Sequence, residues 1–113
     1  MIRYGYAWPA YFPGACMYAA ILHLSFPPAR HDEVARFLVE EMVPVIRDNA
    51  GFIDLRVLDA HSAGELVMID TWLSEDDSRR AAQTPAAVAV HDRFAELQLS
   101  VTSATRYAVI ATS

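Results

Sequence analysis

The sequence predicts an α+β domain in which helices cover one face of a four-stranded antiparallel sheet. Three observations support this fold class. Residues 51 to 59 and 65 to 72 are two runs of alternating side chains joined by a short turn, which is typical of a β-hairpin. Before the hairpin, apolar residues recur at helical spacing between residues 31 and 49. The second run of the hairpin ends at Trp72, and a helix start follows immediately.

The length of 113 residues predicts one domain with a single hydrophobic core. The first 16 residues differ from the rest, because their five large aromatic side chains are interrupted by glycines and prolines. We interpret residues 1 to 16 as an aromatic-rich N-terminal arm that docks on the domain of residues 17 to 113. The alternative is a simple upstream extension, with the domain proper beginning at Met17.

The composition limits the classes of binding partner and the cellular compartment that can be expected. The net charge is −5 and the nine basic residues are spread along the chain, so nucleic acid is not expected as a partner. The first segment has neither the apolar run of a signal peptide nor the length of a membrane span, so no membrane partner is expected. The lone Cys16 cannot form an internal disulfide, which favours a cytoplasmic location.

The first strand is expected over residues 17 to 26, and Pro27-Pro28 ends it. Alternation predicts two distinct faces for this strand. One face carries Tyr18, Leu22, Leu24 and Phe26, and the other carries Met17, Ile21, His23 and Ser25.

An amphipathic helix is expected next, over residues 31 to 49. Pro44 lies inside it, and the missing N–H and bulky ring of proline predict a kink near residues 40 to 44. Asn49-Ala50-Gly51 supplies the C-terminal stop. His31, at the helix start, and His61, in the hairpin turn, are expected to be solvated.

Each strand of the hairpin has one uniformly apolar face and one mixed face. The apolar faces carry Ile53, Leu55 and Val57, then Val67, Ile69 and Thr71, whereas the mixed faces include Leu58, Leu66, Met68, Asp70 and Trp72. After the hairpin, Ser74 is predicted as a helix N-cap with Asp77 three residues on. Thr84-Pro85 starts a second short helix, and a last strand is expected over residues 103 to 112.

The resulting order is the split β-α-β arrangement of ferredoxin-like domains. Helices can cover only one face of the sheet. The other face is expected to carry Met17, Ile21, Leu58, Leu66, Met68 and Trp72, which is too apolar to stay exposed. The hydrophobic share of 54% points the same way. We therefore predict a homodimer in which two sheets pack face to face and form a dimeric α/β barrel.

Residues 17 to 112 resemble the antibiotic biosynthesis monooxygenase (ABM) family of dimeric α/β-barrel proteins. The residues that carry the resemblance are Gly51-Phe52, Thr71-Trp72, Ser74-Glu75-Asp76, and Thr84-Pro85 leading to His91 and Phe94. The resemblance implies a monooxygenase that needs no cofactor and acts on a small aromatic or enolic substrate. Activities in this family include the oxidation of polycyclic phenols to quinones and the breakdown of haem, and some members have no known activity.

The family's reactive residues carry over only in part. In members that form quinones without a cofactor, the Trp corresponding to Trp72 is accompanied by an Asn and a Tyr, which are Met68 and Ser78 here. In haem-degrading members an axial His matches His91, but their ring-distorting Trp would fall at Ala81, and residues 17 to 26 contain no Asn. The resemblance therefore implies no haem cleavage, and it leaves haem binding open.

Three residues are candidates for catalysis, each with a structural alternative. His23 is expected to point into a cavity on the open side of the sheet, where it could act as a base or simply form interface hydrogen bonds. His91 could be a ligand or base, or a packed helix residue. Trp72 could stack on a planar substrate, or belong to the core or the interface.

The predicted substrate-binding residues are Arg56, Asp70, Met68 and Arg106. The two arginines and Asp70 could orient a carboxylate or phenolate, or form cross-strand ion pairs. No His-x-x-x-His or Cys-x-x-Cys spacing predicts a metal site, and no glycine-rich loop predicts a nucleotide cofactor.

Two functions remain open. The first is the oxygenase, with His23 or His91 removing a proton from the substrate and Trp72 as a wall of a dry pocket. The second is a non-catalytic dimeric module of the same fold that binds a small apolar molecule, which the loss of the Asn and the Tyr favours. A cavity lined by His23 and Arg56 would favour the enzyme, and a sealed sheet without a pocket beside Trp72 would favour the module.

Overall fold

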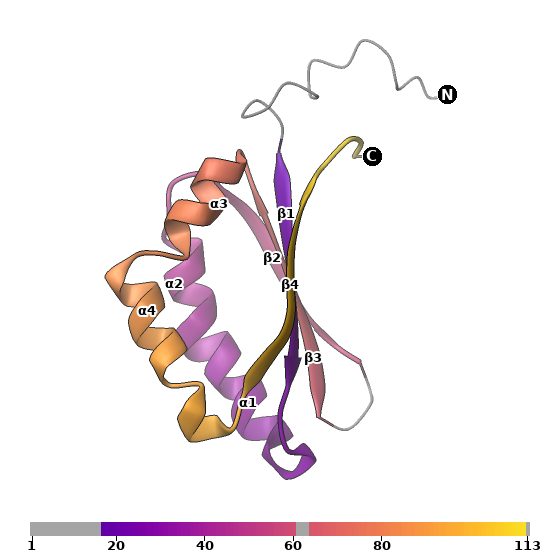
Figure 1. Cartoon of the computed structure of the whole chain (residues 1–113), viewed down its shortest axis with the longest axis vertical. Helices are drawn as coiled ribbons and strands as arrows, with labels where there is room; N and C mark the ends of the chain where they lie inside the picture. The colour runs from indigo at the N-terminus through magenta and orange to yellow at the C-terminus, as the bar shows by residue number, and fades with distance from the viewer. Residues whose placement is uncertain (1–16, 61–63, 113) are drawn as a thin grey trace.

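The computed structural model describes residues 17 to 60 and 64 to 112. Four strands, β1 (Tyr18–Ser25), β2 (Phe52–Asp59), β3 (Glu65–Trp72) and β4 (Ser100–Ala108), form one sheet in the order β2-β3-β1-β4. Every neighbouring pair is antiparallel, as the sequence predicts for a ferredoxin-like α+β domain (Figure 1). The proposed N-terminal arm and His61 lie outside the described residues.

A layer of helices covers one face of the sheet and leaves the other face open (Figure 1). The layer contains α1 (His31–Phe37), η3 (Leu38–Met42), α2 (Val43–Arg47), α3 (Glu75–Ala81) and α4 (Pro85–Asp92), with short 3₁₀ turns at η2 (Pro28–Arg30) and η4 (Ala95–Leu97). In the described part of the chain, none of these helices has the length and apolarity needed to cross a membrane. The prediction of one covered face is confirmed.

The perturbation expected from Pro44 takes the form of a π-helical turn, η3, that leads directly into α2. At its end the N–H of Val43 donates to the carbonyl of Leu38, five residues earlier. This wider turn lets one helix continue through the proline, which has no N–H to donate. Asn49 then stops the helix, because its side-chain amide donates to the carbonyls of Val45 and Ile46 at 2.7 and 3.1 Å.

The predicted caps of the two later helices are confirmed. Ser74 Oγ accepts the N–H of Asp77 at 3.1 Å and begins α3. Thr84 Oγ1 accepts the N–H of Ala87 at 3.1 Å and begins α4, with Pro85 in the first turn. These side-chain caps fix where the chain turns from β3 back over the sheet.

The face assignment of β3 from the sequence is wrong. Leu66, Met68 and Trp72 do not lie on the open face but in the core under the helices, with exposed fractions of 2%, 0% and 1%. Alternation alone could not decide, because Val67 and Ile69 on the opposite face are also apolar. Pairing with β1 decides: Leu24, which is 1% exposed, lies directly opposite Leu66.

The last strand begins and ends earlier than the expected residues 103 to 112. β4 pairs with β1, and its end is set where Ala108 lies opposite Tyr18, the first residue of β1. A register shift between His23 and Leu24 brings Val101 opposite Leu24. The pairing with a distant strand, which the local pattern does not contain, therefore fixes the boundaries of β4.

His31 is half-buried and paired rather than solvated. Its Nδ1 lies 3.0 Å from an oxygen of Asp32, and its Nε2 lies 2.9 Å from an oxygen of Asp59. The ring therefore connects the beginning of α1 with the end of β2. Both carboxylates raise the pKa of His31, with the Asp32 hydrogen bond as the larger cause and the Asp59 hydrogen bond next.

Candidate active site between the helices and the sheet

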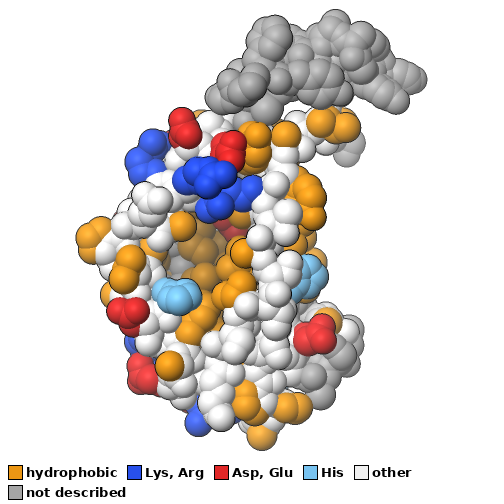
Figure 2. Space-filling view, in the orientation of Figure 1, with side chains coloured by type: hydrophobic (Ala, Val, Ile, Leu, Met, Phe, Trp, Pro, Cys, Tyr) orange, Lys and Arg blue, Asp and Glu red, His pale blue; other side chains and the backbone are white. Residues whose placement is uncertain are grey.

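A cavity of about 410 Å³ lies between the helical layer and the sheet. The space-filling view shows a hollow lined with hydrophobic side chains between the two layers (Figure 2). Its middle is apolar, with Leu22 and Met68 from the sheet facing Met42 of η3 and Ile46 of α2. A volume of this size suits a small organic ligand with fused rings.

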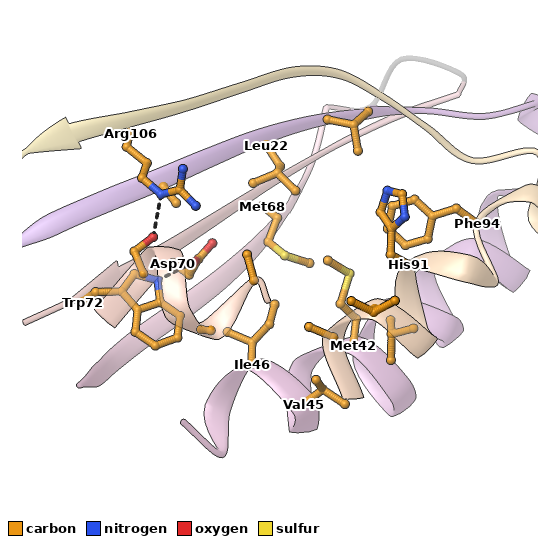
Figure 3. A pocket seen from close by; sticks show the side chains of 18 residues that line it. Leu22, Met42, Val45, Ile46, Met68, Asp70, Trp72, His91, Phe94 and Arg106 are labelled. Atoms are coloured by element: carbon orange, nitrogen blue, oxygen red, sulfur yellow. Dashed lines mark hydrogen bonds between the residues drawn. The ribbon is translucent and has the colours of Figure 1, made fainter. Parts of the chain in front are cut away.

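Polar side chains gather at one end of the cavity (Figure 3). The indole Nε1–H of Trp72 donates to Oδ2 of Asp70 at 2.5 Å. Close by, Nε–H of Arg106 donates to the hydroxyl oxygen of Ser78 at 2.8 Å. Strands β3 and β4 and helix α3 thus contribute to one cluster, because α3 folds back over the sheet directly after β3.

Ala20 separates the acidic and basic members of this cluster. On β1 it lies opposite Asp70 of β3 on one side and opposite Arg106 of β4 on the other. All three side chains therefore stand in one row on the covered face of the sheet. All three residues line the cavity, and Ala20 contributes only its methyl group between the carboxyl group and the guanidinium group.

Asp70 is a buried acid, with only 7% of its surface exposed. Removal from water raises the pKa of the Asp70 carboxyl above its ordinary value, because burial disfavours the charged form. The hydrogen bond from Trp72 and the positive charge of Arg106 act in the opposite direction without cancelling this effect. The pKa of the Asp70 carboxyl is therefore shifted toward the pH range in which proton transfer is efficient.

His91 lies at the other end of the cavity (Figure 3). It stands on α4 and is exposed, and its ring stacks at a tilt of 37° on Phe94 with 4.8 Å between ring centroids. Figure 3 shows the apolar middle of the cavity between this pair and the cluster around Asp70. The cavity thus has two chemically different ends.

The structure brings together Trp72, His91, Asp70, Met68 and Arg106 from the sequence-based candidates. The two other candidates, His23 and Arg56, are exposed and point to the opposite, open face of the sheet. The cavity therefore lies on the helical side, and not on the side where the sequence-based interpretation put it. The reason is the inverted face of β3, which carries three of the cavity residues with it.

Two contributors to the site were not among the sequence-based candidates, although the family resemblance marked Ser78 as the position of a Tyr in quinone-forming members. Ser78 lies in a seven-residue helix, too short for its periodicity to show which side faces inward, and yet it is only 4% exposed. Ala20 matters only as the gap between two residues that are distant in the sequence. Only the strand register reveals that gap.

Among residues 17 to 60 and 64 to 112, no group of three or more His, Cys, Asp or Glu side chains is arranged to hold a metal ion. The side chains that line the described cavity offer acid–base and electrostatic chemistry. The groups available beside the apolar space are a buried carboxyl, a guanidinium group, an indole N–H, a serine hydroxyl and, at the other end, an imidazole.

Comparisons with solved structures show the same fold at low sequence identity. The NE2512 protein of unknown function from Nitrosomonas europaea matches with a TM-score of 0.70 and 16% identity, over 88% of this chain and 95% of that one. SnoaB, a cofactor-independent oxygenase from Streptomyces nogalater, matches with a TM-score of 0.61 and 17% identity, over 88% and 96%. Rv0793 from Mycobacterium tuberculosis matches with a TM-score of 0.64 and 16% identity, over 86% and 96%.

A search of curated proteins found no match. The family model described as "Antibiotic biosynthesis monooxygenase" matches residues 17 to 93, which is more than half of the chain. The match covers β1, the hairpin, and the helices that enclose the cavity. The chain therefore belongs to the antibiotic biosynthesis monooxygenase family.

Proposed function

We propose that this protein is a cofactor-independent monooxygenase that oxidises a small aromatic or enolic substrate in the cavity beside Trp72. The observation that carries the proposal is the combination of an apolar cavity of about 410 Å³ with one polar end, built from Asp70, Trp72, Ser78 and Arg106. Membership of the family supports the reaction class, and the solved oxygenase SnoaB has the same fold.

The proposed reaction needs no reductant besides the substrate. A base removes an acidic proton from a phenol or from a ketone that can form an enol, and the electron pair stays on the substrate as an oxyanion. This electron-rich anion reacts with dioxygen. For a ring CH₂ group that becomes C=O, one oxygen atom enters the product, and the other leaves as water with the two hydrogens.

Apolar walls assist this reaction in two ways. They exclude water from the oxyanion, and they strengthen the electrostatic interactions of the polar groups that remain. Trp72 supplies a flat indole edge at the polar end, and its N–H holds Asp70. Of the two histidines that the sequence suggests as bases, only His91 lines the described cavity.

The test is oxidation of anthrone, a tricyclic ketone with an acidic CH₂ group, followed by quinone absorbance and oxygen uptake. We expect the wild-type protein to form anthraquinone faster than buffer and faster than Trp72→Ala. Arg36→Gln is the matched control, because Arg36 is exposed on α1 and lies outside the cavity. No uptake above the buffer rate with anthrone or with related phenols would remove the proposal.

The alternative is a binding module without catalysis. It is favoured by Met68 and Ser78, which line the cavity at the positions where quinone-forming relatives are expected to place an Asn and a Tyr. Calorimetric binding of anthraquinone that is lost in Trp72→Ala, together with no oxygen uptake on any phenol, would support this second function.

The open face of the sheet is proposed to pack against a second copy of the chain. Ile21, Val67 and Ile69 meet there in adjacent strands, and Leu58 and Tyr107 are 44% and 53% exposed on the same face. Light scattering should report a dimer for the wild type and single chains for Ile69→Asp. Val39→Asp is the control, because Val39 is 58% exposed on the helical layer and should leave the dimer intact.

A further inference from the structure

The row Asp70, Ala20, Arg106 places a proton acceptor and a cation on either side of the Ala20 methyl group. Neighbouring strands lie about 4.8 Å apart, so the backbones of Asp70 and Arg106 are separated by about 10 Å across β1. Their side chains stand on the same face and line the same cavity. A single oxygen-bearing group above Ala20 can therefore approach both side chains.

The two oxygens of the Asp70 carboxyl group have different surroundings. Oδ2 accepts the indole N–H of Trp72 at 2.5 Å, which fixes the orientation of the group. Oδ1 forms no hydrogen bond with another side chain of the described residues. Asp70 itself lines the cavity, so Oδ1 is the carboxyl oxygen left to meet a ligand there.

The Arg106 side chain is likewise held by a hydrogen bond at Nε, while its terminal nitrogens have no such partner among the described residues. Its Nε–H donates to Ser78, whose hydroxyl is neutral. Among the described residues Arg106 forms no ion pair with a carboxylate, and the nearby Glu75 is held by Arg79 through two hydrogen bonds. The terminal NH₂ groups of Arg106 therefore remain able to bind an anion in the cavity.

We infer that Asp70 is the base that removes the substrate proton, and that Arg106 binds the oxyanion formed in the same step. The ligand class is a planar aromatic ketone or phenol with one acidic hydrogen and one oxygen at the same edge. This inference rests on the proposed function and specifies its substrate class and its first step.

The step balances as a simple proton transfer. The C–H or O–H bond of the substrate breaks, and the proton goes to Oδ1 of the Asp70 carboxylate. The electron pair stays on the substrate, and its negative charge concentrates on the oxygen that faces Arg106. The total charge of the cavity is unchanged, because the carboxylate becomes neutral as the substrate becomes anionic.

His91 is less suited to this step because of its position. It lies at the opposite end of the cavity from Arg106, and the apolar side chains of Met42 and Met68 lie between (Figure 3). A proton taken there would leave the oxyanion among apolar groups, where an unpaired charge is costly. At the Asp70 end, the anion forms next to a fixed guanidinium group.

The experiment measures proton removal without oxygen. Anthrone is incubated with the protein in D₂O under anaerobic conditions, and NMR follows the replacement of its CH₂ protons by deuterium. We expect the wild type to accelerate exchange above the buffer rate, and Asp70→Asn to lower the protein-dependent rate by about 100-fold or more, the usual contribution of a positioned base. His91→Gln should keep most of the rate.

Arg106 is tested in the same assay with two variants. Arg106→Met removes the charge and should lower the exchange rate by about 100-fold. Arg106→Lys keeps a cation and should recover part of the loss. Arg36→Gln, at an exposed position on α1, is the control and should match the wild type.

Several results would overturn the inference. These are wild-type exchange no faster than buffer, full exchange in Asp70→Asn, or loss of exchange in His91→Gln with Asp70→Asn unaffected. If Asp70→Asn does not fold, Trp72→Phe serves instead, because it keeps an aromatic ring at this position and removes the donor to the carboxyl. Exchange should persist in Trp72→Phe but begin at higher pH, and an unchanged pH profile would count against Asp70.

Failure of this inference and failure of the proposed function can be told apart. Deuterium exchange that depends on Asp70, without oxygen uptake in air, would support Asp70 as the base and reject the oxygenase function. Oxygen uptake by the wild type that is fully retained in Asp70→Asn would support the oxygenase function and reject Asp70 as the base.

Discussion

Trp72 donates its indole N–H to Asp70, two residues earlier on the same strand, at a distance of 2.5 Å. Residues i and i+2 of a strand share a face, so both side chains point under the helices. The pair is buried, and the hydrogen bond gives the carboxyl group a polar partner in an otherwise apolar wall. The polar end of the cavity therefore begins with a contact inside a single strand.

Asp70 should make stability depend on pH. Burial raises its pKa in the folded protein, so the folded state holds this proton to higher pH than the unfolded state. The wild type should therefore lose stability relative to Asp70→Asn as the pH rises from the ordinary carboxyl value through the folded value. Melting temperatures of both proteins from pH 4 to 8, followed by circular dichroism, check this, and a difference that is constant with pH contradicts it.

His31 should also make the stability of the fold depend on pH, here because its charged form is the stabilising one. The Asp32 and Asp59 carboxylates raise its pKa, so the charged ring stabilises the fold below the unfolded value of about 6.5 and loses this effect as the pH rises through the folded value. His31→Gln should melt lower than the wild type at pH 5.5 and close to it at pH 9. Asp59→Asn should weaken the pH dependence, and an equal deficit at both pH values would argue against the pairing.

Leu66 and Leu58 offer a matched test of which face of the hairpin is buried. Leu66 is 2% exposed in the core and Leu58 is 44% exposed on the open face. Leu66→Ala should lower the free energy of unfolding by about 2 to 5 kcal/mol, because it leaves a cavity. Leu58→Ala should cost less than about 1 kcal/mol within a single chain. Urea titration at low protein concentration measures both, and equal costs would contradict the observed face.

Gly51 should not tolerate a side chain. Its φ is +84°, and an added Cβ would lie 2.3 Å from the carboxyl group of Asp77. Gly51→Ala should destabilise the protein by at least about 1 to 3 kcal/mol from the left-handed backbone alone. Ala50→Gly, in the same exposed turn, is the control, and it should change the urea midpoint much less. A Gly51→Ala protein as stable as that control would be inconsistent with this geometry.

Local sequence signals predicted most of the helices and strands. Ser74 and Thr84 are side-chain caps whose hydrogen bonds close within three residues, so their function depends on nothing distant. The effect of Pro44 was also local, although the structure resolves it as a π turn and not as a break. Such signals fix where helices begin and end, and hence the order of strands and helices.

The sequence predicted only part of the candidate site. Trp72 and His91 were identified through the family resemblance, and both line the cavity. His23 was expected to share a cavity with them, but it lies on the other face of the sheet. The pattern of β3 is apolar on both faces, so the hydrophobic periodicity of that strand contained no information about which side meets the helices.

The sequence by itself determined the fold class, the family, and the residue types available for chemistry, because these depend on local spacing and composition. Only the tertiary structure decided that Asp70 and Arg106 flank Ala20 in one row. That arrangement arises from the register of β3 and β4 on β1, and register is set by the packing of whole faces. A shift of one residue would turn Asp70 to the open side and leave the cavity without its acid.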